Sequence, residues 1–247
     1  MPKTAAAQDV LDFWFDESKP EQWYKKDPAF DETIRGRFED TITAALSARL
    51  DSWADELDSC LALILVLDQF TRKIYRDTPK AFIGDEMALA LSLRCVDRGS
   101  LSHENAAWRQ FMLMPMMHSE DLGIQDRSIP LFEQHTNPLT HEYAVKHRDI
   151  VARFGRFPHR NAILGRPSSE EELAFLKEPG SSSSRCGACR GRPAHHPKLF
   201  RRSCPHEASR RARRQAPTST GPYPPPSASA SACQPSPRGR SVRCRCR

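Results

Sequence analysis

The sequence has 247 residues and a formal net charge of +6, and this charge is distributed very unevenly. Residues 1–180 hold 22 lysines and arginines against 30 acidic residues, whereas residues 181–247 hold 15 basic residues against a single acid, Glu207. A break this sharp excludes one uniform domain and indicates two regions of different role or origin.

The first 180 residues have the usual size of one domain with one core. Their two cysteines, Cys60 and Cys95, lie in apolar runs, where cysteine behaves as a small hydrophobic residue. No disulfide framework is indicated there, so we expect a reducing, cytoplasmic location. The N-terminal residues lack the apolar core of a signal peptide, and the eight-residue apolar run 60–67 is too short to span a bilayer, so no membrane partner is expected.

Apolar residues recur at helical spacing along the whole first region. In chain order, the expected helices cover about residues 9–17, 28–50, 55–76, 85–99, 102–116, 121–132, 140–155 and 169–178. Asp27 before Pro28 is a strong helix start, and Asp85, Ser102 and Thr140 stand at three further expected starts.

Prolines and a capping box give the remaining boundaries. Pro20 is expected to halt the first helix, and Pro115 to kink or end the one that contains it. Ser169 and Glu172 have the spacing of a capping box. No alternating strand pattern appears, so the predicted fold class is all-α, with antiparallel helix pairs in a bundle or a short superhelix.

The segment 60–75, CLALILVLDQFTRKIY, is the expected centre of this domain. Eight apolar residues in a row predict a helix buried on every side. They lead directly to Asp68, and a carboxylate buried alone costs several kcal/mol or more. Asp68 therefore needs a cationic partner or a solvent-lined pocket, and Arg72, four residues on, shares its helix face.

Three polar clusters interrupt the apolar helices and supply the candidate site residues. The first is Asp68, Gln69, Arg72 and Lys73, and the second is His118, Ser119, Glu120 and Asp121. The third is His147, Arg148 and Asp149, continuing through Arg153, Arg156, His159, Arg160 and Asn161. Each cluster also has a structural interpretation. The first is then an internal ion pair, and the second is a helix start whose acids favour the helix dipole. The third is a core histidine beside a solvated basic face.

Charge complementarity between the clusters suggests that they meet. One arrangement places Arg148 or Arg153 against Asp68, with Glu120 and Asp121 nearby. In the other, the third cluster lines a pocket for an anionic ligand, because arginine forks match carboxylate and phosphate geometry. That pocket would contain Arg156, His159 and Arg160.

These clusters lead to a binding or scaffold module as the first functional hypothesis, with a peptide, a protein or a small anionic ligand as partner. The alternative is a hydrolase-type enzyme that uses Glu120 or Asp121 with a histidine as acid and base. No phosphate-binding loop, nucleophile elbow or zinc-protease motif is present, and neither a metal nor a cofactor is predicted.

The basic region 181–247 is rich in Arg, Pro, Ser and Ala and is expected to be disordered. Its arginine pairs would bind nucleic acid without sequence specificity, which is a third hypothesis. A CxxC followed by CxH, formed by Cys186, Cys189, Cys204 and His206, matches zinc spacing imperfectly and lacks apolar support. The composition is also that of a GC-rich gene read out of frame, so this tail is interpreted as a non-native extension.

Several of these motifs resemble a known bacterial family, the domain of unknown function 924. The resemblance covers about residues 8–182 and rests on LDFWF (11–15), QWYKKDPAFD (22–31), LDQFTRKIY (67–75), MHSED (117–121) and HRDIVARFGRFPHRNAILGR (147–166). It implies a helical superhelix similar to tetratricopeptide repeats and no established activity. The family's central motif usually reads DQFPRN, so Thr71 and Lys73 are departures, and Thr71 is expected to let the central helix run on.

Overall fold

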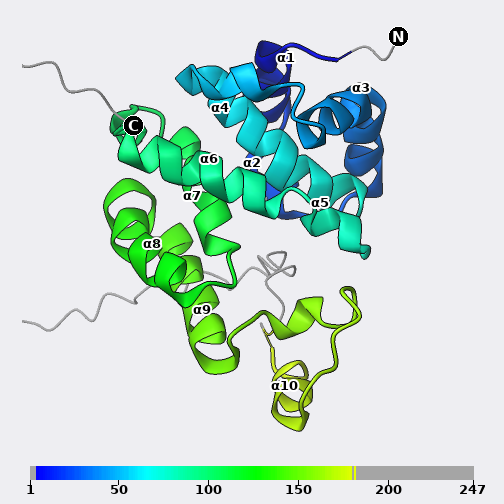
Figure 1. Ribbon diagram of the computed structural model, residues 1–247, viewed down its shortest axis with the longest axis vertical. Helices are drawn as coiled ribbons and strands as arrows, with labels where there is room; N and C mark the ends of the chain where they lie inside the picture. Colours follow the sequence, from blue (N-terminus) through cyan, green and yellow to red (C-terminus); the bar gives the residue numbers. More distant parts are fainter. Residues whose placement is uncertain (1–3, 180, 182–247) are drawn as a thin grey trace, which may run out of the picture. The chain divides into compact units, whose positions relative to one another are not determined.

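The structure is a computed structural model that describes residues 4–179 and 181, and these residues form helices and connecting loops without any β-strand (Figure 1). The helices are α1 Ala7–Leu11, α2 Pro20–Tyr24, α3 Pro28–Leu46, α4 Leu57–Ile64, α5 Thr71–Ile74, α6 Asp85–Asp97, α7 Ala106–Met117, α8 Leu122–His135, α9 Pro138–Phe154 and α10 Glu170–Phe175. The all-α prediction is confirmed.

The central segment is one continuous helical run made of three parts. Helix α4 passes into a π-helical turn, Leu65–Phe70, which passes into α5. Every residue from 60 to 71 is buried, as the unbroken apolar run predicts. Thr71 has helical dihedral angles, and its hydroxyl donates to the carbonyl of Leu67 at 2.7 Å, so the run continues beyond the π-helical turn.

Aromatic rings join the N-terminal helices to this central segment. Trp14, in the π-helical turn Asp12–Glu17 that continues α1, lies 5.5 Å from the rings of both Phe70 and Phe111. The ring of Phe38 on α3 lies 5.0 Å from that of Phe70, tilted by 41°. All four rings are fully buried, so they contribute a large share of the apolar area that stabilises the fold.

Helices α7, α8 and α9 pack as antiparallel neighbours. Arg109, near the start of α7, donates to the carbonyl of His135 at the end of α8, whereas Gln125 near the start of α8 donates to the carbonyl of Met117. Arg148 of α9 pairs with Asp126 of α8 in the same antiparallel sense. The pairing expected from the short linkers is therefore confirmed, and the tetratricopeptide-like superhelix stays a prediction.

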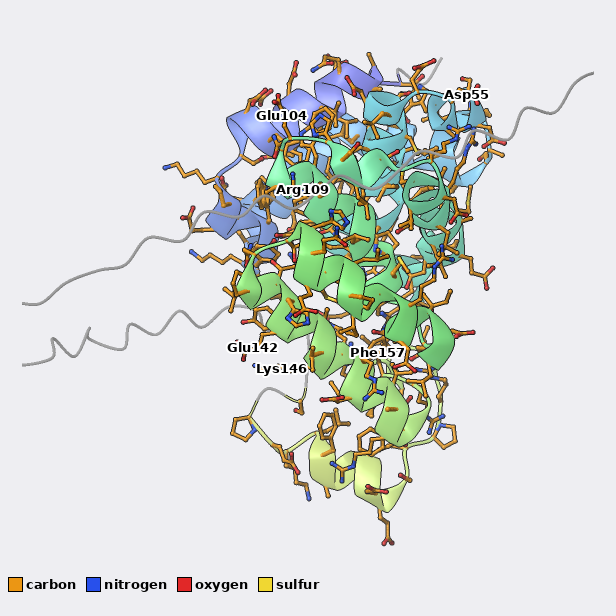
Figure 2. The ribbon with its side chains drawn as sticks, turned by 90° about the vertical axis from the view of Figure 1, so that its left-hand side faces the viewer. Asp55, Glu104, Arg109, Glu142, Lys146 and Phe157 are labelled. Atoms are coloured by element: carbon orange, nitrogen blue, oxygen red, sulfur yellow. The ribbon has the colours of Figure 1, made fainter. Side chains whose placement is uncertain are left out.

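The outer face of α9 is solvated. Figure 2 shows Glu142 and Lys146 projecting from this helix, and their i,i+4 ion pair is 2.6 Å long with both side chains 59% exposed. Packing of the inner face, which carries the buried Ala144 and Val151, orients the helix. Ion pairs as exposed as this one contribute little to stability.

Several helix starts differ from the prediction. The N-caps are Gly84, Asn105 and Asn137, where Asp85, Ser102 and Thr140 were expected. Pro20 begins α2 instead of merely ending the preceding helix, and Pro115 lies inside α7. At α7 and α9 the reason is physical: Ser, Thr and Asn satisfy the same cap chemistry, so neighbouring candidates compete. Helix α6 begins after Gly84 without a side-chain cap. Asp27 and the Ser169–Glu172 capping box are confirmed.

None of the helices in residues 4–179 combines the length and the apolar character that crossing a bilayer requires. The predictions on the basic tail, including disorder, nucleic-acid binding and the zinc ligands Cys186, Cys189, Cys204 and His206, lie outside the described residues.

Candidate functional site

Asp68 lies at the centre of a buried charged network. The π-helical turn carries it, and its side chain is 1% exposed. One carboxylate oxygen contacts Arg72 at 2.9 Å and Nδ1 of His118 at 2.7 Å, while the other accepts from the amide of Gln69. Burial raises the pKa of Asp68, but the charge of Arg72 and the contacts with His118 and Gln69 lower it by more, so the pKa lies well below its usual range.

A second carboxylate, Asp85, extends this network to Arg160. Arg72 bridges the two acids, since it reaches Asp68 and also contacts Asp85 at 2.8 Å. Asp85 in turn accepts from Arg160 at 3.1 Å. Two carboxylates and two guanidinium groups therefore alternate in space, and their formal charges cancel.

The guanidinium of Arg160 lies between aromatic rings. It stands 4.6 Å from the ring centre of Phe82 and 4.7 Å from that of Phe157, a residue labelled in Figure 2. It also donates to the main-chain carbonyl of His118 at 2.9 Å. Burial, followed by the charge of Arg72, lowers the pKa of Arg160 to about 10, so this side chain keeps its proton at neutral pH.

Three histidines gather beside these charges. The rings of His118 and His147 are 6.4 Å apart, and His147 hydrogen-bonds through Nδ1 to the carbonyl of Tyr143 at 2.7 Å. Burial is the main cause that lowers the pKa of His147 to about 4 and that of His159 to about 3. Both rings are consequently neutral at pH 7. His118 contacts the carboxylate of Asp68, and its side chain is 14% exposed.

Glu120 forms a separate ion pair next to the network. Arg166 donates to both of its oxygens at 2.7 and 2.9 Å, and the main-chain NH of Phe157 adds a third bond at 2.7 Å. Burial raises the pKa of Glu120, whereas these bonds lower it by more. Glu120 therefore ties the loop after α9 to the end of α7.

Comparison with known proteins identifies the family. The family described as "Bacterial protein of unknown function (DUF924)" matches residues 10–180. The chain belongs to this family. A solved structure titled "Structure of Protein of Unknown Function ATU0120 from Agrobacterium tumefaciens" is 39% identical, with a TM-score of 0.67, and the match covers 70% of this chain and 97% of that one. No curated protein matches, so DUF924 membership carries a fold without an assigned activity.

The positions of the other predicted site residues in this DUF924 chain differ from the expected arrangement. Arg148 pairs with Asp126 and Asp149, and Arg153 with Glu171, all on exposed surface. The expected pairing of Asp68 with Arg148 or Arg153 is therefore wrong, because both arginines are exposed and paired with these other acids.

The expected anion pocket is also not assembled as predicted. Arg156 donates to both oxygens of the buried Glu172 at 2.7 and 2.9 Å, which helps to lower the pKa of that carboxyl to about 2. Arg160 is occupied by Asp85, in the network. Asp121 caps α8 by accepting from the NH of Ile124 at 3.0 Å, so this carboxylate serves a helix start.

Two functional candidates were missed by the sequence reasoning, Asp85 and Arg166. Asp85 was interpreted as a helix cap, and Arg166 lies in a polar loop with no periodic pattern. A signal existed for Asp85: it is an acid at the start of the helix that directly follows the central segment in the chain, and the connection 75–84 brings it within reach of Arg72. Among the described residues, no group of three or more His, Cys, Asp or Glu is arranged to hold a metal ion.

Proposed function

We propose that this DUF924 protein is a hydrolase-type enzyme in which His118, held by Asp68, transfers protons to and from a substrate or a water molecule. One observation carries the proposal: a buried carboxylate, 1% exposed, hydrogen-bonds to Nδ1 of a histidine that is 14% exposed. This arrangement combines a fixed imidazole with access from solvent.

The chemistry follows from the tautomer that the carboxylate selects. When Nδ1–H of His118 donates to Asp68, the lone pair of Nε2 is left to accept a proton, and the carboxylate stabilises the imidazolium that then forms. With Nδ1 of His118 held by Asp68, Nε2 is the ring nitrogen that this proposal assigns to the substrate.

The energetic cost of the network supports the same conclusion. Buried ion pairs seldom stabilise a fold more than well-packed apolar residues of the same volume. A network that buries Asp68, Arg160 and His147 within one region is therefore poorly explained by stability alone, and perturbed ionisable groups concentrate at functional sites. The acid and base proposed here involve Asp68, in place of the expected Glu120 or Asp121.

A binding module is the second candidate, carried by a different feature. A hollow of about 320 Å³ lies between the first π-helical turn and α3, and Phe13, Phe30, Asp27 and Arg37 are among its lining residues. This volume and this mixture of aromatic and charged walls suit a small ligand. A compound that raises Tm equally in the parent and in a His118 variant favours binding at this hollow.

The test compares His118→Gln with His135→Gln in a panel of chromogenic carboxylic and phosphate esters. Histidine acid–base catalysis contributes about 100-fold or more, so we expect kcat/KM to fall by at least that factor in His118→Gln and to be unchanged in His135→Gln. Equal turnover by the parent and His118→Gln, or no turnover by either, contradicts the proposal.

A further inference from the structure

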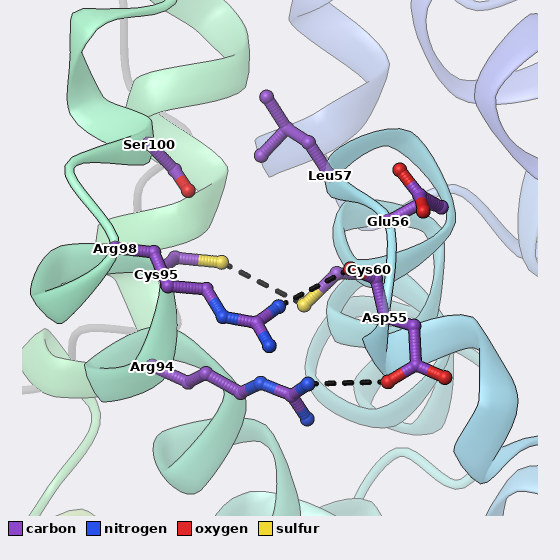
Figure 3. A pocket seen from close by; sticks show the side chains of 8 residues that line it. All are labelled: Asp55, Glu56, Leu57, Cys60, Arg94, Cys95, Arg98 and Ser100. Carbon is purple, nitrogen blue, oxygen red and sulfur yellow. Dashed lines mark hydrogen bonds and ion pairs between the residues drawn. The ribbon is translucent and has the colours of Figure 1, made fainter.

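Two cysteines from different helices face each other away from the charged network. Cys60 lies on α4 and Cys95 on α6, and their sulfur atoms are 3.6 Å apart (Figure 3). Both are free thiols, and they are 3% and 2% exposed. The sequence suggested that each was a small apolar residue, but contact between two thiols creates a reactive pair that neither cysteine offers alone.

A hollow of about 130 Å³ gives access to the two sulfur atoms. Its lining consists of Asp55, Glu56, Leu57, Cys60, Arg94, Cys95, Arg98 and Ser100. A water molecule occupies about 30 Å³ in the liquid, so a hydroperoxide as small as hydrogen peroxide fits this space. Figure 3 shows the guanidinium groups of Arg94, on α6, and of Arg98, the residue after its end, directed across the hollow.

The surroundings make the two thiols chemically unequal. The hydrogen bond from Cys95 lowers the pKa of Cys60, and the charges of Arg94 and Arg98 add to this against the effect of burial. The same thiol contact raises the pKa of Cys95, and burial raises it further. Cys60 is therefore the thiolate that reacts first, because the thiolate is the nucleophile in cysteine chemistry.

We propose that Cys60 and Cys95 form a peroxide-oxidisable pair that closes into a disulfide between α4 and α6. This modification site is independent of the Asp68–His118 proposal. In the first step the Cys60 thiolate attacks a hydroperoxide oxygen, the O–O bond breaks, and the leaving oxygen takes a proton to become an alcohol or water.

The second step consumes the sulfenic acid formed on Cys60. The sulfur of Cys95 attacks the sulfur of Cys60, the S–O bond breaks, and the hydroxide leaves with the Cys95 proton as water. In sum, two thiols and one hydroperoxide give one disulfide, one alcohol and one water. The sulfur pair loses two electrons, and the peroxide bond gains them.

The distance supports ring closure within the folded chain. A disulfide bond is about 2.05 Å long, so the two sulfur atoms need to approach by about 1.5 Å. Helices α4 and α6 already pack against each other, and rotation about the cysteine side-chain bonds supplies part of this approach. The bond would join residues 35 positions apart in sequence, a loop long enough for a clear gain in stability.

The test uses the full chain, treated with excess hydrogen peroxide, alkylated and digested with trypsin. Cleavage after Arg94 and Arg98 places Cys95 in the four-residue peptide 95–98, and Cys60 falls in the peptide 50–72. We expect mass spectrometry to find these two peptides linked, and Tm to rise by about 5 °C or more before digestion. Reduction should reverse both effects.

Three variants sharpen the result. Cys95→Ser should leave Cys60 as a sulfenic acid that dimedone traps, and Cys60→Ser should give no trapped product at Cys95. The double variant Arg94→Gln, Arg98→Gln should slow the oxidation several-fold, because the two positive charges that stabilise the thiolate are then missing. Recovery of both peptides separately alkylated after excess peroxide overturns the proposal. Cross-links from Cys60 to tail cysteines that form equally fast in the parent and in Cys95→Ser overturn it as well.

Discussion

Asp68 shows how a single carboxylate is kept ionised in a fully buried position. Arg72 and His118 both contact one of its oxygens. Without the negative charge of Asp68, the positive charge of Arg72 is balanced by Asp85 alone. We expect Asp68→Asn to lower the free energy of unfolding by about 3 kcal/mol at pH 7, the typical cost of breaking a buried pair. Urea unfolding followed by circular dichroism measures this change.

An exposed pair is the matched control for this prediction. Asp126 and Arg148 lie 2.7 Å apart with side chains 51% and 40% exposed, so Asp126→Asn should change the free energy of unfolding by less than about 1 kcal/mol. The folded pKa of Asp68 is depressed, so its contribution is present above the unfolded pKa and disappears as the pH falls below about 4. A variant as stable as the parent at pH 7 would show that the carboxylate is dispensable.

The sequence predicted that Asp68 needs a partner, and Arg72 on the same helix face is one. The partners from other segments were harder to predict. His118 and Arg160 were recognised as candidates, but which of the arginines turns inward depends on how far α9 continues before Gly155 ends it at a φ of +68°. The rotation of α9 about its own axis is set by its packing against α7 and α8, and no local sequence pattern encodes this packing.

At the scale of elements, a close contact between Gly84 and the π-helical turn Leu65–Phe70 positions α6. A Cβ atom added to Gly84 would lie 2.3 Å from the carbonyl oxygen of Leu67, although the φ of −92° suits any residue. The obstacle is therefore steric. We expect Gly84→Ala to destabilise the fold by about 1–3 kcal/mol, because main-chain atoms have to move. Thermal unfolding measures the effect.

Gly36 is the matched control, because it lies on the exposed face of α3 with nothing within 4 Å of an added Cβ atom. Gly36→Ala should raise the free energy of unfolding by about 0.5–1 kcal/mol through helix propensity. If both alanine variants change stability by the same amount, the close contact at Leu67 is not a constraint. Gly84→Ala should also weaken the Arg72–Asp85 ion pair, because Asp85 is the next residue.

The helices themselves were predictable because apolar periodicity records the buried face of each one. The π-helical turns were not, since one extra residue in a turn within a run that is buried on all sides leaves the apolar pattern unchanged. That extra residue nevertheless sets the direction in which Asp68 and Gln69 point. The architecture was therefore readable from the sequence, and the rotation of its central element was not.

At the scale of the whole molecule, histidines brought together from separate segments make stability depend on pH. His147 on α9 and His159 in the turn that follows have pKa values of about 4 and about 3, below the ordinary value of about 6.5. Between each lowered pKa and about pH 6.5, these histidines bind protons in the unfolded chain but not in the folded one. Their contribution to stability is present above about pH 6.5 and is lost as the pH falls.

We expect the free energy of unfolding to fall between pH 7 and pH 5 by about 2 kcal/mol for each of these two histidines. In His147→Leu the fall should be smaller by the contribution of one proton, whatever the absolute stability of the variant. Carboxyl groups with a lowered pKa, such as Asp68 and Glu120, affect stability at lower pH. The change in unfolding free energy between pH 7 and pH 5 therefore comes from the histidines. If the slope is identical in the parent and in His147→Leu, then His147 becomes protonated in the folded protein between pH 7 and pH 5. The Asp68 network would then carry one more positive charge than its geometry balances.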